Sequence, residues 1–148
     1  MVLSSAWASG STAETLRLTG NFNPDRQDAT VMSVQAAVDK LKAKFGETVL
    51  EIIEFRGETT VVVKKEEIVA VCAFLKEDVG FNFLTDLCGV DYMGQAPRFM
   101  VVYQLYNIAT HTRLRVKAPV EESDTTIDTV RGVWATANWL ERECWDLM

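Results

Sequence analysis

Arg98-Phe-Met-Val-Val-Tyr-Gln-Leu-Tyr-Asn-Ile108 and His111-Thr-Arg-Leu-Arg-Val-Lys-Ala118 carry the clearest strand patterns in the sequence. The first segment is rich in Phe, Val and Tyr, which favour a pleated and half-buried backbone. The second alternates strictly, so that one of its faces carries Thr112, Leu114, Val116 and Ala118. We therefore expect two adjoining strands in this part of the chain.

Two helices are predicted upstream of these strands from apolar residues that recur at helical spacing. Ser33 suits the cap of a helix that runs to about Phe45 and ends at Gly46. Its apolar face would carry Val34, Ala37, Val38, Leu41 and Phe45. A second helix is expected over 66–76, with an apolar stripe formed by Ile68, Val71, Cys72 and Leu75.

Three further strands and a last helix complete the expected element order. Strands are predicted at 49–55 and 59–64, joined by a hairpin turn with Gly57. Residues 81–90 read as a strand whose middle, Leu84 to Gly89, could instead hold a bend. A final helix is expected to begin near Thr126 or Ile127, to break at Gly132 and to resume by Ala137.

The order α-β-β-α-β-β-β-α predicts an α+β fold, a two-layer α/β sandwich with a mixed or antiparallel sheet. We expect residues 1–30 to form a flexible arm and residues 31–148 to form a single domain. The 148 residues contain 48% apolar residue types and carry a net charge of −6. A net-acidic chain has few cations for neutralising phosphates, so nucleic-acid binding is not expected.

Membrane and cofactor signals are absent from the sequence. No apolar run approaches the roughly 20 residues that span a bilayer, and no secretory signal pattern opens the chain. Neither a G-x-G-x-x-G motif nor a Walker loop is present, and a single histidine and three scattered cysteines predict no metal site. The cysteines, Cys72, Cys88 and Cys144, fit small buried apolar residues of a reducing compartment.

Two polar clusters are candidates for a contact surface. His111, Arg113, Arg115 and Lys117 form a cationic row on one face of the second strand, about 7 Å apart. The last ten residues combine Trp139, Trp145 and Arg142 with acids that oppose the helix dipole. Ala137, Leu140, Cys144 and Leu147 would face the core, while Arg142 could pair with Asp146. Aromatic residues and Arg outside a core are typical of interface anchors.

Several ordered blocks resemble one protein family. Glu141-Arg-Glu143, then Asp146 and two apolar residues, resembles the opening of the signature of the C subunit of proton-pumping NADH:quinone oxidoreductase, the thirty-kilodalton subunit of respiratory complex I. Leu84-Thr-Asp-Leu-Cys-Gly-Val-Asp-Tyr92 resembles the family's apolar-Asp-x-x-x-Val-Asp-Tyr segment. Arg98 to Leu105, followed by Leu114-Arg-Val-Lys117, resembles its central strand pair. The resemblance covers roughly residues 33–148.

The resemblance implies an accessory subunit of the peripheral arm that holds no cofactor. Such a protein packs against the large hydrogenase-like subunit of the quinone site and supports electron transfer from NADH to quinone. It would lie in the cytoplasm, peripheral on the inner (plasma) membrane. The family's signature continues with a Phe-Gly turn and basic residues, so we expect this chain to be a shortened form. The expected contact residues are Glu141, Arg142, Glu143, Asp146, Trp139, Trp145, Arg113 and Arg115.

Three alternatives stay open at this point. Related subunits occur in membrane-bound hydrogenases and in dehydrogenases that oxidise reduced coenzyme F420. An independent enzyme would need Asp86, Asp91 and Asp146 to converge in a pocket. A stand-alone adaptor would bind anionic partners through the cationic row at 111–117.

Overall fold

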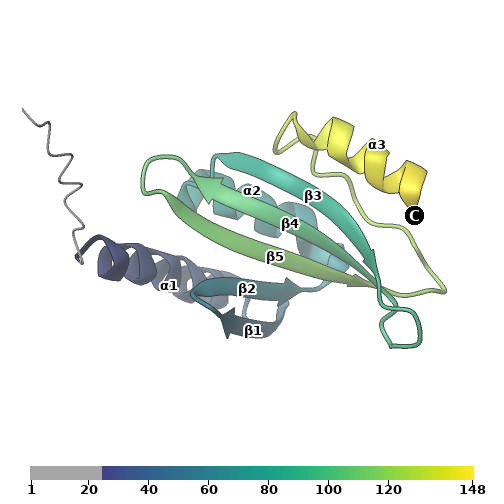
Figure 1. Ribbon diagram of the computed structural model, residues 1–148, viewed down its shortest axis with the longest axis horizontal. Coiled ribbons are helices and arrows are strands. Elements are labelled where there is room, and N and C mark those ends of the chain that lie inside the picture. The colour runs from purple at the N-terminus through teal and green to yellow at the C-terminus, as the bar shows by residue number, and fades with distance from the viewer. Residues whose placement is uncertain (1–24) are drawn as a thin grey trace, which may run out of the picture.

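The computed structural model describes residues 25–148, with side chains from residue 34, and shows a five-stranded sheet with helices packed against it (Figure 1). In chain order the elements are α1 (Asp25–Phe45), β1 (Val49–Phe55), β2 (Glu58–Val63), the 3-10 turn η1 (Lys65–Glu67), α2 (Ile68–Phe74), the π-helical turn η2 (Leu75–Val79), β3 (Phe83–Asp91), β4 (Phe99–Asn107), β5 (Thr112–Val120) and α3 (Ala137–Leu147). Residues 1–24 of the predicted arm lie outside the described residues, and 25–30 belong to α1. The helix therefore begins before Ser33, which is not its cap.

The sheet has the strand order β1-β2-β5-β4-β3. Three neighbouring pairs are antiparallel, while β2 and β5 run parallel through Thr60–Val62 and Arg115–Lys117. The predicted element order, mixed sheet and two-layer sandwich are confirmed. The β1–β2 hairpin turns at Arg56 and Gly57, whose φ angles are 52° and 78°. Two positive φ values in a two-residue loop are those of a type I′ turn, which matches the twist of paired strands.

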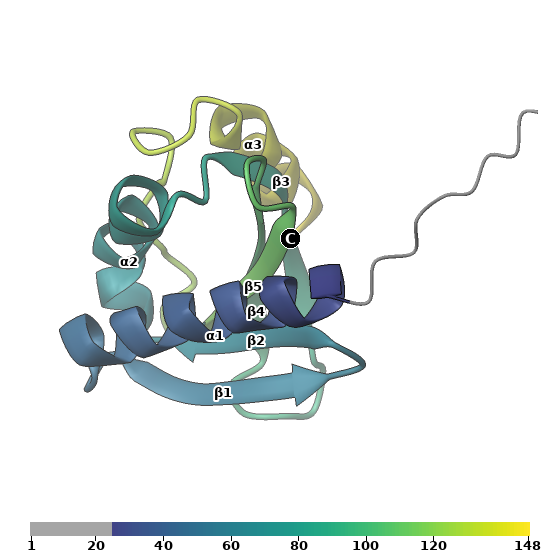
Figure 2. The same cartoon turned by 90° about the vertical axis from the view of Figure 1, so that its left-hand side faces the viewer.

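The core lies between one face of the sheet and the helices, with α1 and α2 along that face (Figure 2). The predicted stripes of α1 and α2 are buried, apart from Phe45, which is half-buried. The second helix differs in its details, because η1, α2 and the wider η2 together span 65–79. The side chains at alternate positions of β5, from Thr112 to Ala118, are also buried as predicted. Local apolar spacing therefore identifies the buried side of these elements correctly.

The predicted helical turns from residue 126 to 132 are not formed. Asp124 Oδ1 accepts hydrogen bonds from the Thr126 N–H at 3.2 Å and from the Thr126 hydroxyl at 2.6 Å. Lys65 Nζ binds the Asp124 carboxylate at 2.6 Å and the Thr126 carbonyl at 3.2 Å. These contacts satisfy backbone groups outside a helix, which removes the need for helical hydrogen bonds there. The helix begins only at Ala137.

A β-bulge interrupts β3 between Leu84 and Asp86, where the expected bend lies. The extra residue keeps Leu84 and Leu87 buried in the core and leaves Asp86 exposed. Asp86 Oδ1 accepts the Leu87 N–H at 2.9 Å, which fixes the carboxylate beside its own strand. The bulge thus determines which β3 side chains face the helices and which face the open side of the sheet.

Candidate interface on the last helix and the sheet

The last helix packs against β3 at a glycine. A Cβ built on Gly89 would lie 2.9 Å from Met148 Cγ and 3.0 Å from Cys144 Sγ. Such short distances are closer than ordinary van der Waals contact, so a side chain at this position would push α3 away. Gly89 therefore allows the close approach of the helix to the strand, and sequence analysis gave it no such role.

Glu141 joins α3 to the preceding loop. Its carboxylate accepts a hydrogen bond from the Val130 N–H at 2.8 Å and another from the Thr129 hydroxyl. The half-buried Glu141 side chain thus points toward its own domain. The predicted contact residue Glu141 has an internal role, holding the helix in place. Sequence analysis missed Thr129 and Val130 as its partners.

Replacement of Glu141 by alanine is expected to lower the free energy of unfolding by about 1–3 kcal/mol. The variant leaves the N–H of the buried Val130 without an acceptor, and hydrogen bonds to charged groups contribute about this much. The matched control is Glu143→Ala, because Glu143 is exposed on the same helix. Urea denaturation of both variants measures the difference, and equal midpoints would contradict an anchoring role for Glu141.

The outer surface of α3 consists of Trp139, Arg142, Glu143, Trp145 and Asp146, which are all exposed. Trp139 and Trp145 expose 71% and 86% of their surface. The Arg142 guanidinium lies over the Trp139 ring, 5.5 Å from its centroid. Within residues 25–148 no ion pair joins Arg142 to Asp146, because the guanidinium takes the aromatic ring as its partner. Ala137, Leu140 and Cys144 face inward as predicted, whereas Leu147 is 76% exposed.

A cleft runs beside this outer surface. It has a volume of about 550 Å³ and lies between α3, the 125–129 loop and the ends of β3 and β4. Its apolar walls include Val101, Ile127, Cys144 and Met148, and Trp145 also lines it. An apolar cleft next to an exposed tryptophan has the form of a socket for a partner side chain.

Arg113 and Arg115 lie on the face of the sheet opposite to α1 and α2, away from the α3 residues. Arg115 Nη2 forms an ion pair at 2.6 Å with Glu58 of β2, the parallel neighbour of β5. Arg113 lies over the Tyr106 ring at 6.0 Å, and His111 Nδ1 contacts the Tyr106 hydroxyl at 2.8 Å. The predicted contact residues therefore divide between two surfaces. The cationic row is partly neutralised, which weakens the case for an anion-binding adaptor.

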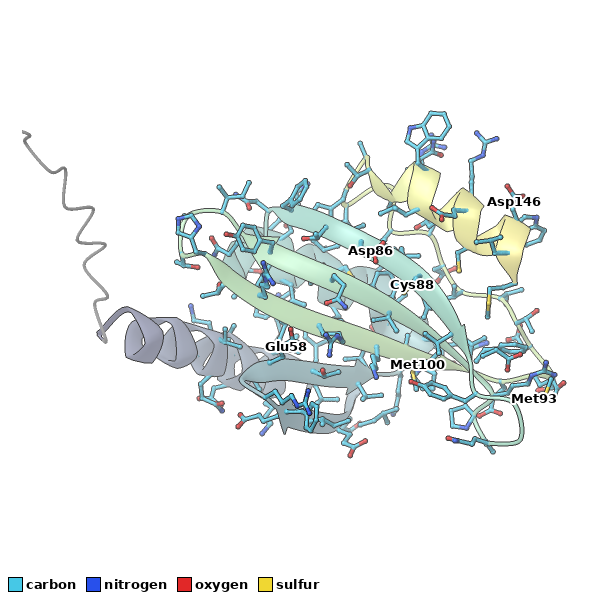
Figure 3. The ribbon with its side chains drawn as sticks, in the orientation of Figure 1. Glu58, Asp86, Cys88, Met93, Met100 and Asp146 are labelled. Atoms are coloured by element: carbon cyan, nitrogen blue, oxygen red, sulfur yellow. The ribbon has the colours of Figure 1, made fainter. Side chains whose placement is uncertain are left out.

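The carboxylates of the alternative enzyme do not converge. Asp86 lies on the open face of β3 and Asp146 on α3 (Figure 3). Asp91 forms an ion pair with Arg98 at 2.9 Å, and this hydrogen bond holds the pKa of the carboxyl below its ordinary value. All three are exposed. A shared pocket is what an acid–base pair would need, so this hypothesis loses its support.

The three cysteines are free, and Cys72 is fully buried. Burial raises the pKa of the Cys72 thiol to about 12. Burial is also the first cause that raises the pKa of Cys88 and of Cys144 above the ordinary thiol value. Cys88 and Cys144 are only half-buried, so the predicted burial holds for Cys72 alone. Thiols with raised pKa values are nevertheless poor nucleophiles at neutral pH. Among the described residues no group of three or more His, Cys, Asp or Glu side chains could hold a metal ion.

Comparison with known proteins identifies the family of this chain. The family model described as the 30 Kd subunit of respiratory-chain NADH dehydrogenase matches residues 61–148, from β2 to the chain's last residue. The chain belongs to this family. The C subunit of the NADH-quinone oxidoreductase of Geotalea uraniireducens (strain Rf4) is 62% identical over 112 residues, which cover 76% of this chain and 68% of the relative. Its counterpart from Geobacter metallireducens (strain ATCC 53774 / DSM 7210 / GS-15) is 58% identical over 113 residues, which cover 76% and 70%.

The fold of this thirty-kilodalton family also agrees with solved structures. The trypsin-resistant fragment (1-134) of Nqo5 superposes with a TM-score of 0.70 at 33% identity and covers 79% of this chain and 92% of the fragment. A protein of the membrane-bound sulfane sulfur reductase, an archaeal respiratory membrane complex, shares the fold with a TM-score of 0.66 at 21% identity and covers 78% and 67%. The resemblance to the thirty-kilodalton subunit of complex I is therefore confirmed. Over residues 25–148, no helix has the length and apolar character needed to cross a bilayer.

Proposed function

We propose that this subunit docks, through the outer surface of α3, on the large hydrogenase-like subunit that forms the quinone site. The observation that carries the proposal is the pair of exposed rings of Trp139 and Trp145, with Arg142 held over the first ring. Trp and Arg are the residue types that most often anchor protein interfaces. An isolated domain gains nothing from presenting two large apolar rings to water.

In the proposed role this chain positions a partner subunit and catalyses no reaction itself. Glu141 and Gly89 hold α3 at a fixed distance from the sheet, so the anchor residues are presented on a rigid element. A partner side chain in the cleft beside Trp145 would be surrounded by apolar walls. In this proposal the thirty-kilodalton protein holds no cofactor and transfers no electrons itself. It supports the passage of electrons from NADH to quinone by fixing the larger subunit, on the cytoplasmic face of the membrane.

Co-expression of an affinity-tagged form of this protein with the large hydrogenase-like subunit tests the proposal. We expect the two proteins to elute together in equal amounts, while an untagged control retains neither. A folded tagged protein that elutes alone would contradict the docking role. A visible absorption band in the purified protein, or NADH oxidation by it alone, would contradict the absence of a cofactor.

A further inference from the structure

We propose that the free edge of β1 binds an extended, basic segment of a partner subunit as a sixth strand of the sheet. This surface is separate from α3, and the inference rests on the proposal that the chain works within an assembly. β1 stands at one end of the strand order, and within residues 25–148 no strand pairs with its outer edge. Main-chain pairing at an open edge is a recurring mode of partner recognition.

The backbone of β1 has the donors and acceptors for such pairing. The two-residue turn makes Phe55 and Glu58 a hydrogen-bonded pair, so bonded and non-bonded pairs alternate from there along the ladder. Glu54, opposite Thr59, and Ile52, opposite Val61, therefore occupy non-bonded positions. At such positions the N–H and C=O groups point away from the partner strand, here toward the free edge. An added strand would satisfy these groups in the spacing of an ordinary ladder.

The side chains of β1 are also unusually apolar for an edge. Leu50, Ile53 and Phe55 expose 52%, 37% and 65% of their surface. Native edge strands are normally protected by charges, proline, bulges or covering segments, because exposed apolar edges pair with other chains. The bulge near Glu51 lies at the start of β1, and the rest of the ladder to Phe55 is regular. Covering by a partner would remove these side chains from water.

The acidic side chains near β1 favour a basic segment as the added strand. Glu51 and Glu54 are exposed on β1 and Glu47 is exposed in the turn before it, and none forms an ion pair with a described side chain. The basic residues at the ends of the hairpin are Arg56, whose guanidinium lies over the Phe55 ring at 5.0 Å, and Lys64. A second copy of this chain would bring its own Glu47, Glu51 and Glu54 to the same ladder, where the like charges would repel. Lys or Arg on an incoming strand would instead neutralise them.

Hydrogen exchange of the assembled complex tests the added strand directly. In the isolated protein the amides of Ile52 and Glu54 are expected to exchange rapidly. In the complex they are expected to slow by about 100-fold or more, because each donates to the added strand. Unchanged exchange of both amides in a complex whose α3 amides are protected would overturn the proposal and leave the docking role of α3 intact.

A matched pair of variants separates the backbone from the side chain. Glu54→Pro removes the outward N–H, whereas Glu54→Ala keeps it, and proline is tolerated on an edge strand where the N–H faces solvent. We expect Glu54→Pro to reduce co-purification with the complex by about tenfold relative to Glu54→Ala. Circular dichroism of the isolated variants checks that both fold, and the exchange measurement on the wild type does not depend on either variant.

The charge of the occupant is tested by reversing the acids. A Glu51→Lys, Glu54→Lys double variant is expected to lose about as much co-purification as Glu54→Pro. Protected edge amides together with full retention of this variant would overturn the basic character of the occupant. Light scattering that shows the isolated protein as a dimer with protected β1 amides would also overturn the proposal, because the occupant would then be a second copy.

Discussion

Replacing both Trp139 and Trp145 with alanine is expected to weaken assembly with the large subunit by about 100-fold or more. Truncation of an interface anchor commonly costs at least about 2 kcal/mol, and each 1.4 kcal/mol corresponds to a factor of ten in affinity. The stability of the isolated domain is expected to change by less than about 0.5 kcal/mol, because both rings are exposed. Co-purification yields, measured over a dilution series, give the loss of affinity.

The matched control replaces two other exposed apolar residues, which lie outside α3. Met93 lies in the loop between β3 and β4, and Ile108 lies in the turn between β4 and β5. A Met93→Ala, Ile108→Ala variant removes exposed apolar surface without touching the proposed contact, so its affinity is expected to remain that of the wild type. Equal losses in the two double variants would show that general exposed apolar surface, rather than the α3 rings, carries the association.

Gly89→Val is expected to destabilise the domain by about 1–3 kcal/mol and to displace α3. The valine side chain would occupy the space that Cys144 Sγ and Met148 Cγ now fill, and inserted carbon atoms in a packed region typically cost this amount. Urea denaturation measures the stability. Faster exchange of the α3 amides than in the wild type would locate the effect at the contact between strand and helix.

Gly132→Val is the control for this substitution. A Cβ at Gly132 would meet no heavy atom within 4 Å, and its φ is not in the left-handed region. The same glycine-to-valine change is therefore expected to leave both stability and α3 exchange nearly unchanged. A similar loss at both positions would mean that β-branching, rather than the close approach at Gly89, causes the effect.

The buried faces of α1, α2 and β5 were predictable from the sequence because apolar spacing within one element reports which side it buries. The exposure of Trp139 and Trp145 was predictable for the related reason that these two rings cannot share the inward stripe. The role of Glu141 was not predictable, because its partners are set by the path of the preceding loop. The parallel pairing of β2 with β5 was not predictable either, because a local sequence pattern does not show which distant strand lies beside a given strand.

The exposed edge of β1 illustrates the same limit. Val49-Leu-Glu-Ile-Ile-Glu-Phe55 has apolar residues on both faces, a pattern that favours a covered strand, and the sequence does not show what covers it. The carboxylates of the alternative enzyme were misjudged for a similar reason. From the sequence alone, nothing shows that Asp86, Asp91 and Asp146 lie on separate elements that keep their carboxylates apart. Convergence in space depends on topology, which is established by the whole chain.

The parallel pairing of β2 with β5 affects the order in which the chain can fold during its synthesis. Thr60 and Arg115, which face each other across this junction and share a hydrogen bond, are 55 residues apart in the chain. Ladders of such long range form late, because a large loop must close before they contribute. The β1–β2 hairpin is therefore synthesised before its partner strand, and β2 can pair with β5 only after β5 has left the ribosomal exit tunnel. During that interval β2 lacks its neighbour β5, and apolar side chains exposed in this way are what holdase chaperones bind.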